Sequence, residues 1–188
     1  MKNLDHLAKF HELVRNQFQY GGQKYALNNS RESTDQLFDD HGKNWLFGTM
    51  DKYIFRFRNL ERERDLLKIA TYCFILYLKK GFFIRQQGLR NDVLDTTVET
   101  KEKYFPLFIQ DLEATFKEWL QEGILTKIED FSTEKKLYNM SNVFKIWSKE
   151  SWEDLSKLSI FGVYYCAFLI WHSRYLLIEK HDEDIGEK

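Results

Sequence analysis

Apolar side chains recur along the chain at spacings of three and four residues, with polar side chains between them. This spacing is typical of amphipathic helices, and one proline and nine glycines offer few positions that would break them. In the first segment, for example, Leu7, Val14 and Phe18 fall on one helix face. The pattern therefore predicts an all-α protein, a helical bundle of about six to seven helices.

Glycines and small polar residues set the expected helix ends. Glycines mark expected helix ends at positions 21–22, 42, 81 and 123, and serines mark expected helix starts at positions 33, 132 and 151. Pro106 suits a first helical turn, because its missing N–H is not needed there. The predicted helices cover residues 3–20, 33–42, 44–58, 61–80, 106–121, 132–147 and 151–180.

Residues 82–98 lose the helical spacing and are rich in turn-forming side chains, as expected of a linker. They divide the chain into a helical domain at 1–81 and a second helical set at 99–180, followed by a polar tail at 181–188 that we expect to fray. The order of Asp, Leu, Lys, Tyr and Cys in 65–73 is repeated in 154–166. Two pseudo-repeated halves would explain this repeat. Core helices also tend to use the same few residue types, and we favour this second explanation.

Charge and composition exclude several classes of protein. Lys and Arg number 28 against 29 Asp and Glu, which argues against a protein that grips nucleic acid mainly through its phosphates. An apolar share of 43% and an aromatic share of 16% exclude a disordered chain. This much large apolar surface is hard to cover in one copy, so we expect a homo-oligomer.

The sequence predicts a soluble, cytoplasmic protein without a membrane partner. The first ten residues mix charged and apolar side chains, unlike a signal peptide. The most apolar stretch, 159–171, is shorter than the roughly 20 residues of a membrane span. Cys73 and Cys166 lie in apolar runs, and we expect both to be reduced packing residues.

Cations with helical spacing occupy the segment on either side of a predicted turn at Asn59. Lys52 and Arg56 stand four residues apart before the turn, and Lys68 follows Asp65 by one helical turn after it. An antiparallel hairpin would bring them to a shared face, where ammonium and guanidinium groups could hold the phosphates of a nucleotide.

Carboxylates with similar spacing could hold a magnesium ion beside those cations. Glu32 and Asp35 are three residues apart, and Glu61 and Asp65 are four apart. Carboxylate oxygens are preferred magnesium ligands, and the combination suits phosphoryl transfer or pyrophosphate release. The alternative is that the alternating charges of 61–65 form a solvated, ion-paired surface, and spacing alone favours this alternative.

Other chemical signatures are missing from the sequence. No P-loop and no dinucleotide-binding glycine pattern occurs, and the cysteines and histidines lack zinc-site spacing. Trp45, Tyr53 and Phe55 lie among the cations, and such aromatic side chains could stack on a nucleotide base or a single strand. We expect most of them to be core residues, and the neutral net charge counts against single-strand binding.

Two motifs carry a resemblance to a known family. Residues 48–56 follow the pattern Gly-Asn-x-x-Lys-Tyr-x-x-Arg, with Thr49 in place of Asn, and 65–72 follow Asp-Leu-x-Lys-Ala-x-x-Tyr, with Ile69 in place of Ala. They resemble a small helical family of phages and prophages known as nucleotide-kinase-like or of unknown function. The same region is distantly similar to the all-helical MazG-like nucleotide pyrophosphohydrolases, which bind magnesium through acidic residues.

The resemblance implies a phage-type protein of nucleotide metabolism that binds a nucleotide and magnesium. The implied ligand-binding residues are Lys52, Tyr53, Arg56 and Lys68. The implied catalytic residues are Glu32, Asp35 and Asp65, and the implied metal ligands are Glu32, Asp35, Glu61 and Asp65. The alternative is a non-enzymatic helical module that acts on a host or self partner, in which the same motifs only stabilise a hairpin.

Overall fold

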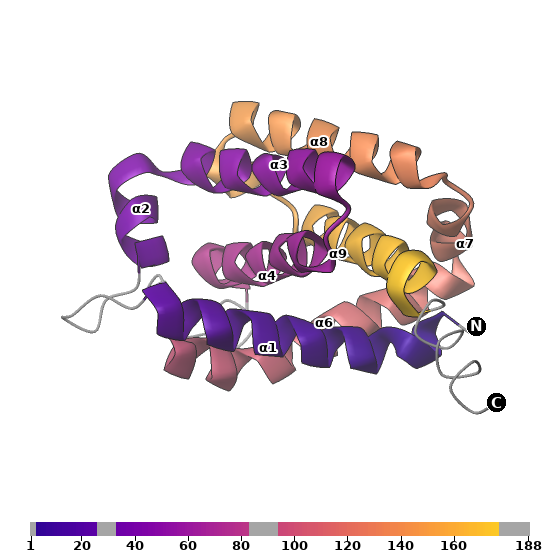
Figure 1. The fold of residues 1–188 in the computed structure, drawn as a ribbon, viewed down its shortest axis with the longest axis horizontal. Helices are drawn as coiled ribbons and strands as arrows, with labels where there is room; N and C mark the ends of the chain where they lie inside the picture. Colours follow the sequence, from indigo (N-terminus) through magenta and orange to yellow (C-terminus); the bar gives the residue numbers. More distant parts are fainter. Residues whose placement is uncertain (1–2, 26–32, 83–93, 177–188) are drawn as a thin grey trace.

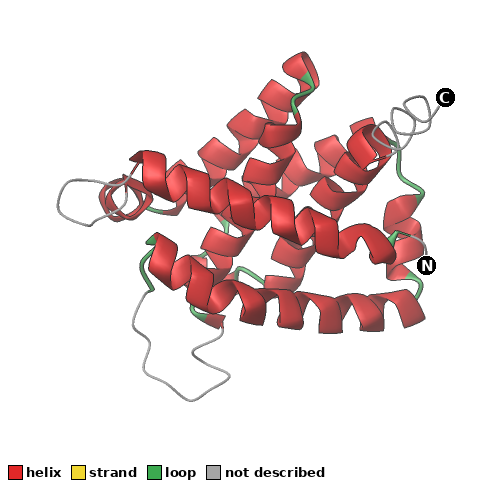
Figure 2. Cartoon of the chain, turned by 60° about the horizontal axis from the view of Figure 1, so that its bottom comes forward, coloured by secondary structure: helices red, strands yellow, loops and turns green. Residues whose placement is uncertain are grey.

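The computed structural model describes residues 3–25, 33–82 and 94–176, and these form helices joined by short loops (Figure 2). The α-helices are α1 (Leu7–Tyr25), α2 (Ser33–His41), α3 (Lys43–Leu60), α4 (Glu63–Lys80), α6 (Val98–Gln121), α7 (Ile124–Glu129), α8 (Thr133–Lys149) and α9 (Lys157–Trp171). Shorter segments are η1 (Leu4–His6), η2 (Trp152–Asp154) and the π-helical η3 (His172–Leu176). No strand occurs in the described ranges, so the predicted all-α bundle is confirmed, with slightly more helices than expected.

The helices form three layers, with α4 and α9 in the middle (Figure 1). Helices α3 and α8 lie on one side of this pair, and α1 and α6 lie on the other. Helix α9 is apolar almost all round, as expected of a helix covered on every face, and most side chains of α4 are buried as well. Helix α2 stands across one end of the layers, where it closes the space between α1 and α3.

Aromatic rings join the two parts of the chain in a single apolar core. The Phe74 ring centroid lies 5.7 Å from that of Phe18, 5.1 Å from Phe105 and 5.2 Å from Phe108. These rings come from both sides of the expected linker at 82–98, of which 83–93 lie outside the described residues. The division into domains and the duplication of halves stay predictions.

Several predicted helix ends are confirmed. Gly81 follows α4 with a left-handed φ of 66°, which a glycine adopts without a steric penalty. Ser132 caps α8, because its side chain accepts a hydrogen bond from the Lys135 N–H at 3.1 Å. The turn between α3 and α4 falls at Glu61, whose N–H donates to the Phe57 carbonyl at 2.8 Å.

Two helices begin or end elsewhere than predicted. Helix α1 continues past Gly21–Gly22 to Tyr25, since a glycine costs a helix only about 1 kcal/mol, which packing of the helix can outweigh. Helix α6 begins at Val98, well before Pro106, because the Thr97 side chain caps it by accepting from the Thr100 N–H at 3.3 Å. Pro106 therefore lies inside α6.

The last helix also begins later than predicted. Ser151 opens only the short η2, and the extended, buried Leu155 separates η2 from α9. The α9 cap is Ser156, which accepts from the Leu158 N–H at 3.1 Å. The predicted continuation over 177–180 and the tail at 181–188 lie outside the described residues. No helix of the described ranges has both the length and the apolar composition that crossing a membrane requires.

Candidate functional site

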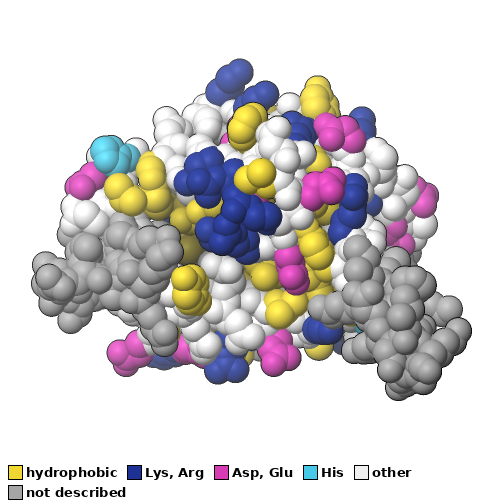
Figure 3. Space-filling view, in the orientation of Figure 1, with side chains coloured by type: hydrophobic (Ala, Val, Ile, Leu, Met, Phe, Trp, Pro, Cys, Tyr) yellow, Lys and Arg dark blue, Asp and Glu magenta, His cyan; other side chains and the backbone are white. Residues whose placement is uncertain are grey.

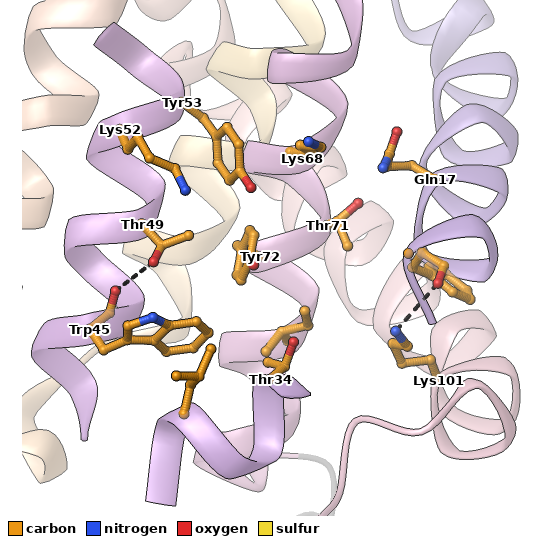
Figure 4. A pocket seen from close by; sticks show the side chains of 14 residues that line it. Gln17, Thr34, Trp45, Thr49, Lys52, Tyr53, Lys68, Thr71, Tyr72 and Lys101 are labelled. Atoms are coloured by element: carbon orange, nitrogen blue, oxygen red, sulfur yellow. Dashed lines mark hydrogen bonds between the residues drawn. The ribbon is translucent and has the colours of Figure 1, made fainter. Parts of the chain in front are cut away.

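A cavity of about 440 Å³ opens between α1, α2, α3, α4 and α6 (Figure 4). Its cationic lining residues are Lys52, Lys68 and Lys101, and its neutral polar ones are Gln17, Thr34, Thr49 and Thr71. Its aromatic lining residues are Phe18, Trp45, Tyr53 and Tyr72. No aspartate or glutamate of the described residues lines it, so its charged side chains are all positive.

Helical periodicity explains why α3 and α4 supply most of this lining. Trp45, Thr49 and Lys52 recur at spacings of four and three along α3, and Lys68 and Tyr72 are four apart on α4. Since the Glu61 turn makes the two helices an antiparallel pair, their inward faces meet along the cavity. The predicted hairpin is thus confirmed, with its turn two residues later than expected.

The cations that the sequence analysis singled out gather around one ring. The Nζ atoms of Lys52 and Lys68 lie 4.9 and 5.0 Å from the Tyr53 ring centroid. The Arg56 guanidinium carbon lies 5.9 Å from it. The structure therefore brings together the four predicted ligand-binding residues, and Figure 3 shows a group of Lys and Arg side chains near the middle of one face of the molecule. Whether they bind a ligand stays a prediction.

The cationic cluster has one carboxylate close to it, that of the buried Asp65, whose charge partly offsets those of the cations. Partial burial lowers the pKa of the Lys68 ammonium, and the charges of Arg64, Arg56 and Lys52 lower it further against the opposing effect of Asp65. The ion pairs of α3 and α4 within the described ranges use Arg58, Arg62 and Lys79, and none involves Lys52 or Lys68. An anion at this rim would meet a site that already favours negative charge.

Aromatic rings form the wall below these cations. The Tyr53 and Tyr72 rings stack with centroids 5.8 Å apart, and the Trp45 ring meets Tyr72 edge-on at 6.4 Å. Figure 4 shows Trp45 and Tyr72 facing the open space from α3 and α4. A flat apolar ligand can lie against such a wall.

The neutral polar residues differ in how far they are committed to the protein. The hydroxyl of Thr49 donates to the Trp45 carbonyl at 2.8 Å, and that of Thr71 to the Leu67 carbonyl at 2.7 Å. The amide of Gln17 reaches into the cavity from α1, and within the described ranges no residue makes a hydrogen bond to it. It can both donate to and accept from a ligand.

Asp35, a predicted catalytic and metal-binding residue, is instead part of a buried ion pair. Its carboxylate is 5% exposed and accepts a hydrogen bond from Lys79 Nζ at 2.6 Å. The backbone N–H and the hydroxyl of Thr96 donate to it as well, at 2.9 to 3.0 Å. With these donors in place, the carboxylate ties α2 to α4 and to the start of α6, and it does not face the cavity.

The other predicted carboxylates lie apart from Asp35. Asp65 is 1% exposed in the core, where the nearest cationic atom is Arg62 Nε at 3.7 Å, too far for a hydrogen bond. Glu61 is exposed at the turn, with its Oε1 3.4 Å from Arg174 Nη1. Glu32 lies outside the described residues.

The described carboxylates therefore do not fit a magnesium ion at the cavity. Asp35 is saturated by protein donors, Asp65 is buried, and Glu61 stands at the far end of α3. In 3–25, 33–82 and 94–176, no three His, Cys, Asp or Glu side chains are grouped so that they could hold a metal ion. The magnesium prediction, which includes Glu32, stays a prediction.

Nucleophiles and histidines elsewhere are used for packing. Burial raises the pKa of the Cys73 and Cys166 thiols, which makes them poor nucleophiles. His11 Nδ1 lies 2.7 Å from the Tyr164 hydroxyl, and burial lowers the pKa of His11 to about 4. His6 Nδ1 lies 2.9 Å from His172 Nε2, which links η1 to the end of α9.

Sequence reasoning missed the contributions of α1, α2 and α6 to the cavity. Lys101 carried one signal: it lies one turn before the buried Phe105, so it shares the inward face of α6. Its ammonium donates to the Phe18 carbonyl at 3.4 Å. Gln17 and Thr34 carried no signal that distinguishes them from surface residues.

No family model matches the chain, and the comparisons with curated proteins and with solved structures find no match either. The resemblance to the phage helical family and to the MazG-like enzymes stays a prediction. The function must therefore be argued from the cavity itself.

Proposed function

We propose that the cavity binds a nucleotide, with its phosphates at Lys52 and Lys68 and its base against the aromatic wall. The observation that carries this proposal is the charge of the site: two lysines share the Tyr53 ring at 4.9 and 5.0 Å, and the lining contains no described carboxylate. Phosphate oxygens would form charge-assisted hydrogen bonds with these ammonium groups.

The size and the two-part polarity of the cavity support a small organic anion. Ligand pockets span about 300–1,000 Å³, and the volume of about 440 Å³ falls in the lower part of that range. A cationic rim and an aromatic wall match a molecule with a charged end and a flat end. Stacking of a base on Trp45 or Tyr72 would contribute about 1–3 kcal/mol.

The lining residues of the cavity support nucleotide binding, but they do not support catalysis. Phosphoryl transfer and pyrophosphate release need a group that positions or activates a nucleophile. Among the described lining residues, none is a histidine, an aspartate or a glutamate. We therefore propose a nucleotide-binding protein, and a reaction on the nucleotide remains the narrower proposal made from the sequence resemblance.

Isothermal titration with the common ribonucleoside and deoxyribonucleoside mono- and triphosphates tests the proposal. At least one should bind to the wild-type protein, and the double variant Lys52→Met/Lys68→Met should bind it at least about tenfold more weakly, since each lost charge-assisted hydrogen bond contributes about 1.5–3 kcal/mol. The matched control is Lys127→Met on α7, an exposed lysine outside the cavity lining.

Two results would contradict nucleotide binding at this cavity. One is the absence of binding by the wild-type protein at millimolar nucleotide. The other is a nucleotide that binds equally well to the double variant and to the Lys127→Met control, which would place its site elsewhere on the molecule.

A second candidate, an interaction module, is favoured by a different observation. Phe55 on α3 is 68% exposed and Tyr138 on α8 is 55% exposed, and these two helices pack side by side. Exposed large apolar side chains on adjacent helices can bind a partner or a second copy of the chain. Light scattering tests the self-association: a dimer that Phe55→Ser converts to a monomer supports it, and a monomer at all concentrations removes it.

A further inference from the structure

We propose that the cavity takes its nucleotide free of magnesium, with lysine and arginine side chains neutralising the phosphates in place of a metal ion. This inference rests on the proposed function and narrows it to one chemical form of the ligand. It departs from the expectation drawn from the sequence, in which carboxylates beside the cations hold a magnesium ion.

The number of cations is sufficient for the charge of a nucleotide. Lys52 and Lys68 lie within 5.0 Å of the Tyr53 ring centroid, and Arg56 lies at 5.9 Å. Arg64 is near enough for its charge to lower the pKa of Lys68. Arg56 and Arg64 are exposed, so the positive groups extend from the rim of the cavity onto the surface of α3 and α4.

The described carboxylates that could hold a metal do not line the cavity. Asp35 accepts from Lys79 at 2.6 Å and from Thr96, so its oxygens are occupied. Asp51, the acidic residue next to Lys52, is turned toward α8, where it accepts from the Ser141 hydroxyl at 2.7 Å. Asp65 is 1% exposed and is not part of the cavity lining. A magnesium ion at the rim would meet cations without any described carboxylate as its ligand.

Free magnesium should compete with the protein for the phosphates. A metal ion bound to a triphosphate removes part of its negative charge and occupies oxygens that the ammonium groups would otherwise bind. Because the described charged side chains that line the cavity are all positive, new contacts to the metal would not compensate for the lost contacts between phosphate and ammonium groups. The magnesium complex should therefore bind more weakly than the free nucleotide.

Titration of the full chain with the triphosphate that binds best, once in EDTA and once in excess magnesium, tests the inference. Binding in EDTA should be on the order of threefold or more tighter than in magnesium, as expected for an electrostatic site that loses ligand charge. Equal affinity in the two conditions would contradict the inference, because the magnesium complex would then bind as well as the free nucleotide. Inorganic tripolyphosphate, which lacks the base, should likewise bind more tightly in EDTA than in magnesium.

Three further results would contradict the inference, and only one of them also contradicts nucleotide binding. Binding that is tighter in magnesium, or that occurs only in magnesium, overturns the metal-free form while nucleotide binding itself stands. Binding in neither condition overturns both proposals. A bound signal from manganese added to the protein without nucleotide, detected by electron paramagnetic resonance, would also overturn the metal-free form, because it would reveal a metal site in the protein.

Glu32 supplies a separate control, because it is the one acidic residue of segment 26–32. The variant Glu32→Gln should leave the affinities in EDTA and in magnesium unchanged within experimental error. If it instead weakens binding in magnesium but not in EDTA, a carboxylate-held metal takes part and the inference is wrong. Lys127→Met again serves as the variant that alters a charge outside the cavity.

Discussion

Two lysines on α4 occupy opposite electrostatic settings. Lys79 donates to the Asp35 carboxylate at 2.6 Å, and both side chains are buried. About three helical turns earlier, Lys68 lies near three cations, Lys52, Arg56 and Arg64, and near the Asp65 carboxylate, which makes no ion pair with it, and it lines an open cavity. A buried charge with its partner inside the protein serves the fold, whereas a cationic cluster beside a cavity is suited to a partner from outside.

Breaking the buried Asp35–Lys79 ion pair should have the largest effect on stability. The variant Asp35→Asn removes the charge that compensates Lys79, and loss of one partner of a buried pair costs about 3–5 kcal/mol. The free energy of unfolding should fall by that amount in urea denaturation followed by circular dichroism. The double variant Asp35→Asn/Lys79→Met should recover part of it, because no uncompensated charge is left. A loss below about 1 kcal/mol in the single variant, the range of surface pairs, would contradict a structural role of Asp35.

His11 provides a second, smaller test of the protein's internal polar contacts. Burial lowers the pKa of His11 from 6.5 to about 4, so the unfolded chain binds a proton at a pH where the folded chain does not. The stability that neutral His11 contributes is complete above pH 6.5 and is lost as the pH falls toward 4. The loss over this interval should be roughly 2–3 kcal/mol.

The pH dependence should be measured against the variant His11→Asn, whose amide can still meet the Tyr164 hydroxyl. Urea denaturation of the two proteins between pH 7 and pH 4 should show a steeper decline for the wild type, as proton linkage requires. Parallel curves for the two proteins would mean that His11 does not titrate across this interval.

Removing the charge of Lys68 should affect the stability of the fold much less than removing the charge of Asp35. The variant Lys68→Met removes an ammonium group that lies among like charges but also helps to compensate the buried Asp65 carboxylate, so its free energy of unfolding should fall by no more than about 1 kcal/mol. Nucleotide binding should weaken in the same variant. A large loss of stability with unchanged binding would reverse the comparison, because Lys68 would then serve the fold.

Sequence patterns predicted what lies close together along the chain. Helical spacing within 44–80 was enough to place Lys52, Arg56 and Lys68 on adjoining faces of a hairpin, because each helix fixes the direction of its own side chains. The cap at Ser132 and the end at Gly81 were predictable for the same reason, since a helix end depends on a few neighbouring residues.

Contacts between distant segments were beyond the reach of these patterns. Asp35 was expected to face the cations of the hairpin, but its partners Lys79 and Thr96 lie 44 and 61 residues away in the sequence. Nothing in the spacing of α2 shows which of several lysines its carboxylate will meet once the layers pack. The same limit explains why Gln17 on α1 and Lys101 on α6 were not expected at the cavity.

A crystal structure of the protein with the tightest-binding nucleotide would test the central claim most directly. The account predicts phosphate oxygens within hydrogen-bond distance of Lys52 and Lys68 Nζ, and the base against Trp45 or Tyr72. A nucleotide bound on another face of the molecule, or a cavity left empty at saturating nucleotide, would contradict it.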